Sequence, residues 1–89
     1  MPLQMSFTHD EATYSNGYLI IPSISVNSNK AYIFLNWFES KSAHESGYSY
    51  VNQTVYTVET TYFDSGNVIT LAYEYLKGLP QFSNAVEVL

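Results

Sequence analysis

Cysteine and arginine are absent from this chain of 89 residues. Without cysteine, the chain forms no disulfide, offers no thiolate nucleophile and cannot build a cysteine-ligated zinc or iron–sulfur centre. The four glycines stand apart from one another, so there is no glycine-rich phosphate-binding loop. A chain this short buries only about 60–65% of its unfolded surface, so its stability depends on a small core.

Charge is also scarce, because charged residues make up 12% of the chain against a usual value of about 25%. Lys30, Lys41 and Lys77 are the only basic residues, and eight acids leave a net charge of −5. We expect no nucleic-acid partner, since such binding needs cations that displace counterions from phosphates. The polar surface must be built from serine, threonine, asparagine and tyrosine, which are easier to dehydrate against another protein than lysine and glutamate.

The sequence predicts neither a membrane span nor a signal peptide. No stretch approaches ~18 continuous apolar residues, and residues 1–10 have neither a basic region nor an apolar core. No internal repeat or linker divides the chain, so we expect one domain made in the cytoplasm, which leaves only as part of an assembly.

Residues 18–62 have the composition of a β-sheet. The segment 18–26 predicts a strand with Ile20 and Ile24 on one face. Pro22 cannot donate a ladder hydrogen bond, so this strand is expected at an edge of the sheet or with a bulge at the proline.

The segment before this strand, residues 1–17, has no clean period. The alternating Met5 and Phe7 predict a short edge strand or an arm. The sequence Ser-Asn-Gly at 15–17 predicts a turn, because asparagine and glycine accept positive φ.

The segment 31–38 predicts the strongest strand, because both of its faces are apolar. Ile33, Leu35 and Trp37 share one face, and Tyr32, Phe34 and Phe38 share the other. A strand of this kind is expected at the centre of a sheet. We expect a helix on one side and either the N-terminal segment or a partner chain on the other.

Two less regular segments follow. Residues 39–47 are polar and predict a mobile surface loop. Residues 48–62 are rich in valine, threonine and tyrosine but do not keep one phase of alternation. This pattern predicts two short strands, or one strand with a bulge near 52–54.

Residues 64–79 predict an amphipathic helix. Asp64 or Ser65 is expected to cap its first turn, and Gly78, in a left-handed conformation, and Pro80 are expected to end it. The apolar face comprises Val68, Leu71, Ala72, Tyr75, Leu76 and Leu79. With a tail at 80–89 that includes a short strand at 85–89, the elements predict a two-layer α+β fold, a small antiparallel sheet packed against one helix.

His9 and His44 are the two candidate bases for catalysis. His9 stands beside Asp10 and Glu11, but a metal site needs three or four ligands with supporting groups. His44 lies in the predicted loop, and nothing in the pattern pairs two carboxylates across a cleft. We therefore expect no enzyme activity, no cofactor and no metal site, and we interpret these groups as solvated surface residues.

The nine tyrosines have two interpretations, as strand residues or as contact residues that combine a large area with a polar tip. We predict an interface that includes Tyr48, Tyr50, Tyr56, Tyr62 and Phe38. Trp37 is favoured as a core residue over a platform for a sugar ring, which would require exposed, coplanar aromatic rings.

The segment 67–88, NVITLAYEYLKGLPQFSNAVEV, resembles the C-terminal end of a group of small tailed-bacteriophage proteins. In that group a β-rich first half leads into a helix with the pattern AYxYLKxLPxF and a short AxxV tail. The matching positions are 72–77, 79–82 and 85–88, about a quarter of the chain. Each of these residues has a packing role, so the resemblance indicates an origin more than an activity.

The resemblance implies a non-enzymatic virion subunit, as a capsid decoration or a tail or baseplate component. Its partners would be other virion proteins or further copies of itself, and repeated copies make weak contacts effective. The alternative is a small acidic inhibitor of a host enzyme or defence system, which should gather its acids on one face. The sequence leaves open the part of the particle, the copy number and the strand order.

Overall fold

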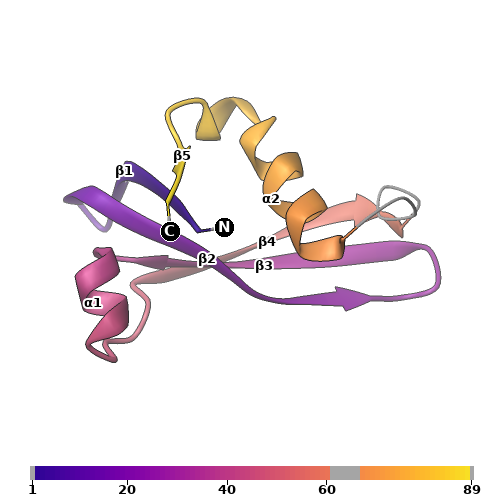
Figure 1. Cartoon of the computed structure of the whole chain (residues 1–89), viewed down its shortest axis with the longest axis horizontal. Coiled ribbons are helices and arrows are strands. Elements are labelled where there is room, and N and C mark those ends of the chain that lie inside the picture. The colour runs from indigo at the N-terminus through magenta and orange to yellow at the C-terminus, as the bar shows by residue number, and fades with distance from the viewer. Residues whose placement is uncertain (1, 61–66, 89) are drawn as a thin grey trace.

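The computed structural model describes residues 2–60 and 67–88, and over these it confirms a small α+β fold (Figure 1). A five-stranded antiparallel sheet has the order β4-β3-β2-β1-β5. The strands are β1 (Leu3–His9), β2 (Ala12–Val26), β3 (Lys30–Phe38), β4 (Asn52–Glu59) and β5 (Val86–Glu87). The helices are α1 (Lys41–Glu45), α2 (Val68–Lys77) and the short 3-10 helix η2 (Pro80–Phe82).

The core lies between one face of the sheet and the segment formed by α2 and η2. Figure 1 shows this segment on one side of β2 and β3 and α1 on the opposite side, at one end of the sheet. The largest fully buried side chains come from the sheet, α2 and η2: Leu3, Leu19, Ile33, Leu35, Leu76 and Phe82. The predicted central position of β3 is confirmed, since β2 and β4 pair with its two edges.

Helix α2 begins later than predicted. Asn67 is its N-cap, and the Asn67 side chain accepts a hydrogen bond from the Thr70 N–H at 3.1 Å. Asp64 and Ser65, the predicted caps, lie outside the described residues. The buried face comprises Ala72, Tyr73 and Leu76, whereas Val68 of the predicted apolar face is 38% exposed.

The helix ends at the predicted glycine, but by another geometry. Gly78 is the C-cap with φ −78°, so it adopts a right-handed conformation instead of the left-handed one expected. Pro80 then occupies the first position of η2, where its fixed φ suits a helical turn. The predicted strand after it is confirmed as β5, which pairs with β1.

The predicted turn at residues 15–17 is wrong, because these residues lie inside β2. The β1–β2 hairpin turns at Asp10 and Glu11, both with positive φ, of 50° and 68°. Gly17 has a different role from the one expected. The Phe7 ring of β1 packs over it, in the space that a Cβ atom would occupy.

The bulge at Pro22 is confirmed by a register shift between Ile20 and Ser23. A bulge adds one residue to the alternation of side chains along a strand. Ile24 therefore packs toward the core, on the face opposite Ile20, although the two residues were predicted to share a face. The Ile21 N–H, at the bulge, donates a 2.9 Å hydrogen bond to the Tyr73 hydroxyl of α2. The helix thus satisfies a backbone donor that the bulge leaves out of the ladder.

Two further corrections concern the segment after β3. The predicted mobile loop contains α1, whose N-cap Ser40 accepts a hydrogen bond from the Ala43 N–H at 3.0 Å and whose Ala43 is buried. Strand β4 is continuous, with an unbroken register from Asn52 to Glu59. The mixed phase in the sequence comes from Val55, which lies on the sheet face opposite that of Tyr56 and Val58, and not from a bulge.

Candidate functional site

The sheet has a second face, directed away from α2, that the described part of the chain covers only at one end. Its members follow from the strand register, because directly paired residues point to the same side. Three rows cross β2, β3 and β4: Ile20, Asn36 and Gln53; Ser23, Phe34 and Val55; and Ser25, Tyr32 and Thr57. We call these nine residues the open face.

No side chain of the open face is ionised. Val55 is 49% exposed, and Ile20, Tyr32 and Phe34 are half-buried. The other members are hydroxyl and amide residues, and the Gln53 side-chain amide donates to Asn36 Oδ1 at 2.7 Å. An apolar centre with an uncharged polar rim can lose its water to a protein surface at small cost.

The covered end of this face lies under α1. The His44 ring is edge-on to Phe38, with centroids 4.7 Å apart, and 5.4 Å from the ring of Tyr18. Burial, together with the nearby Glu45 carboxylate, raises the pKa of Tyr18. This hydroxyl therefore stays neutral at physiological pH, and the aromatic cluster adds no charge to the face.

The predicted interface residues are not brought together. Tyr48 and Tyr50 are 68% and 45% exposed, as an interface requires. Phe38 is buried beneath His44 and the ring of Tyr50, so it supports the surface without forming it. Tyr56 points toward α2 and packs against Phe82 with centroids 5.9 Å apart, and Tyr62 lies outside the described residues.

The tyrosines are less exposed than the composition suggested. Tyr18 and Tyr73 are buried, and those at 14, 32, 56 and 75 are half-buried. Of the nine, only Tyr48 and Tyr50 are exposed in the described part of the chain. No direct signal in the sequence marks the open face, because its members are neighbours only once the strand order is known.

Trp37 is a core residue and not a sugar platform. Its ring packs against Phe7 at 5.0 Å and against Phe82 at 5.7 Å. Its indole N–H donates to Thr54 Oγ1 at 2.9 Å. The two rings and the hydrogen bond fix the indole on the α2 side of the sheet, as the favoured interpretation predicted.

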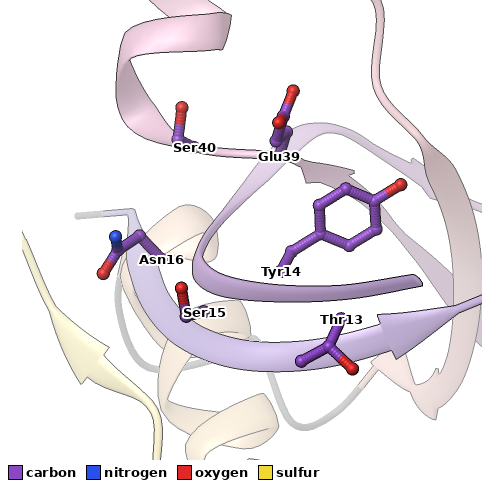
Figure 2. Close-up of a pocket in the computed structure, with 6 residues that line it drawn as sticks. All are labelled: Thr13, Tyr14, Ser15, Asn16, Glu39 and Ser40. Atoms are coloured by element: carbon purple, nitrogen blue, oxygen red, sulfur yellow. The ribbon is translucent and has the colours of Figure 1, made fainter.

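A polar pocket of about 210 Å³ lies beside α1. Figure 2 shows its lining residues in two segments, Thr13, Tyr14, Ser15 and Asn16 from β2, and Glu39 and Ser40 before α1. Sequence reasoning missed this pocket because residues 15–17 were expected to form a turn. The lining offers hydroxyl, amide and carboxylate groups, but it pairs no nucleophile with a histidine or lysine base.

The His9 cluster stays small. His9 Nε2 lies 3.3 Å from Asp10 Oδ2 at the hairpin turn. Residues 2–60 and 67–88 contain no group of three or more histidine, aspartate or glutamate side chains placed to hold a metal ion. In the same residues, no helix has the length and apolar character needed to cross a membrane.

Comparisons of the chain with protein-family models, with curated proteins and with solved structures found no match.

Proposed function

We propose that this protein is a non-enzymatic structural subunit of a tailed-bacteriophage particle and that it acts through protein–protein contacts on the open face. The observation that carries the proposal is the chemistry of this face, where Ile20, Phe34 and Val55 lie among uncharged polar side chains. The part of the particle, capsid decoration or tail or baseplate component, belongs to the same proposal.

The composition of the face supports contact with protein. Tyr32 and Phe34 stand side by side along β3, each flanked by a β2 serine and a β4 residue. Covering apolar area stabilises a contact by about 25 cal/mol per Å², and aromatic residues surrounded by neutral contacts are typical centres of binding energy. A modest single contact is sufficient where many copies assemble together.

The resemblance of the segment 67–88 to phage proteins supports the origin assigned in this proposal. Within this segment, Leu76 and Phe82 are buried and Pro80 begins η2. The residues of the resemblance therefore attach the helix to the sheet, whereas the residues of the open face are those that we propose contact a partner.

The alternative, an acidic inhibitor of a host enzyme, lacks a supporting charge pattern. Glu59 and Glu87 are paired with Lys30 and Lys77 at 2.7 and 2.9 Å. Asp10 and Glu11 occupy the β1–β2 turn, and other acids lie near α1 or on α2. Glu59 and Glu87 are neutralised by these pairs and do not contribute to the continuous acidic face that a nucleic-acid mimic requires.

Mass spectrometry of purified virions tests the proposal. The chain should be present at a constant copy number after washing in high salt. A Phe34→Ser variant should be lost from the particles, whereas Val26→Ser, at an exposed position near the β2–β3 turn, should be retained. Virions that contain none of the wild-type chain would contradict the proposal.

A further inference from the structure

Within residues 2–60 and 67–88, strand β4 forms an unprotected edge of the sheet. It is the first strand in the order β4-β3-β2-β1-β5, and among these residues its eight members pair only with β3. It contains no proline, no lysine and no bulge, which are the usual devices that prevent edge-to-edge pairing. Its register with β3 is regular over its whole length.

The rest of the sheet is protected in ways that β4 is not. Strand β1 pairs with β2 as far as Leu19, and beyond that point β2 carries the bulge at Pro22. On this side the Ile21 N–H already donates a hydrogen bond to the Tyr73 hydroxyl. At the other end of the sheet, β5 covers the outer edge of β1 at Leu3 and Gln4.

The backbone groups that β4 presents outward can be assigned from the ladder. The Asn27 N–H donates to the Lys30 carbonyl at the end of the β2–β3 ladder, and the Val51 N–H donates to the Trp37 carbonyl on the β4 side of β3. Hydrogen-bonding direction alternates along a strand, so the residues of β3 directed to β4 are those at 31, 33 and 35. Their partners on β4 are 58, 56 and 54. The N–H and C=O groups at 53, 55, 57 and 59 therefore point away from the sheet.

The charge distribution at this edge favours a second copy of the same chain. Although the chain carries a net charge of −5, Glu59 is the only ionisable acid on β4, and it is already paired with Lys30 at 2.7 Å. The acids at the β1–β2 turn and on β5 lie at the far side of the strand order. The β4 strands of two copies can therefore pair without placing two charged β4 side chains opposite each other.

We propose that two copies of this chain pair antiparallel through β4, about a twofold axis at Val55, to form one ten-stranded sheet. In this register Gln53 lies opposite Thr57 of the second copy, and Thr54 lies opposite Tyr56 of the second copy. Glu59 lies opposite Val51, so no two charged residues face each other across the axis. The register uses the outward N–H and C=O groups of residues 53, 55 and 57.

The pairing also extends the open face. Phe34 lies beside Val55 within one chain, and the axis places Val55 beside its own copy. The apolar row Phe34–Val55 of one chain then continues into the same row of the other, so an uncharged stripe crosses the dimer. The inference goes beyond the proposed function and holds whether or not the protein belongs to a virion.

Sedimentation velocity of the full chain over a range of concentrations tests the pairing, with two matched charge variants. Ser25 and Thr57 are both exposed and flank Tyr32 from opposite sides, but only Thr57 is on β4. The wild type should be a dimer, Thr57→Lys should raise the dimer Kd at least about tenfold, and Ser25→Lys should change it little. A monomeric wild type, two variants that dissociate alike, or a Thr57→Lys variant that dimerises like the wild type would overturn the inference.

Because the chain has no cysteine, a single introduced thiol gives a second test that does not depend on charge. At the axis the two Val55 Cα atoms would be about 5.5 Å apart, within the range that a disulfide spans. Mild oxidation should convert Val55→Cys to a covalent dimer at least about tenfold faster than Ser25→Cys on the same face. Equal rates for the two variants would place the contact elsewhere and reject the β4 pairing.

Discussion

Gly17 lies where the β1–β2 hairpin is closely packed. It is buried, and a Cβ atom there would overlap the Phe7 ring and lie 2.6 Å from the Met5 carbonyl oxygen. Gly17→Ala should therefore destabilise the fold by about 1–3 kcal/mol, since the Met5 carbonyl belongs to the backbone of β1 and the Phe7 ring is packed against Tyr14 and Trp37. Urea denaturation measures this loss, with the exposed Ser15→Ala as the control. Equal stabilities of the two variants would contradict the packing described for Phe7.

Tyr73 connects α2 to the bulge in β2 through its hydroxyl. Tyr73→Phe keeps the ring but leaves the Ile21 N–H without its 2.9 Å partner, so it should cost about 1–3 kcal/mol in denaturant unfolding. Tyr48→Phe, at an exposed tyrosine, should be neutral. A neutral Tyr73→Phe would indicate that water satisfies the Ile21 N–H equally well.

The same hydroxyl gives a pH dependence. Burial raises the pKa of Tyr73, while the hydrogen bond from Ile21 acts in the opposite direction. The unfolded chain therefore loses this proton first, at about pH 10, and the free energy of unfolding falls as pH rises above that value. Thermal melts between pH 8 and pH 11 should show a smaller alkaline loss for Tyr73→Phe than for the wild type. If the melting temperatures of the two proteins fell in parallel with pH, the alkaline loss of stability would come from ionisable groups other than Tyr73.

Helix α2 is held to the sheet by a narrow buried face. Leu76 is fully buried, whereas Ile69 on the same helix is 42% exposed. Leu76→Ala should cost about 2–5 kcal/mol by creating a cavity, and Ile69→Ala should cost less than about 1 kcal/mol. Denaturant melts of the two variants compare them directly. Similar losses of stability in the two variants would mean that Leu76 is not on the face of α2 that packs against the sheet.

The elements that the sequence predicted best are those with a strong apolar pattern. The central place of β3 followed from its two apolar faces, and the end of α2 followed from Gly78 and Pro80. Pro22 correctly predicted a bulge. The faces of β2 were nevertheless assigned wrongly after it, because one inserted residue reverses the alternation.

The elements that the sequence missed depend on contacts distant in the chain. The hairpin turns at Asp10 and Glu11, although the local signal at 15–17 was stronger, because the fit of Phe7 over Gly17 fixes the register. Helix α1 has only five residues, too few for a periodic pattern. Of the candidate site, only Tyr48 and Tyr50 were found at exposed positions. The open face requires strand order, which residue spacing does not supply.

At the scale of the whole molecule, the low charge and the uncharged open face both favour contact with other protein. Two of the three lysines are in ion pairs, and the open face has no ionised side chain. The exposed tyrosines, Tyr48 and Tyr50, follow α1 near the covered end of the same face. These features favour a subunit that functions in contact with other protein, through the face of the sheet and along the β4 edge.

Hydroxyl-radical footprinting of the protein, free and within purified particles, tests this account most directly. Tyr32 and Phe34 of the open face should be oxidised in the free chain and protected at least about fivefold in the particle, because a partner would exclude water from them. Val86 on β5, which is 56% exposed, should react equally in both samples. Equal oxidation of Tyr32 and Phe34 in the two states would contradict the account.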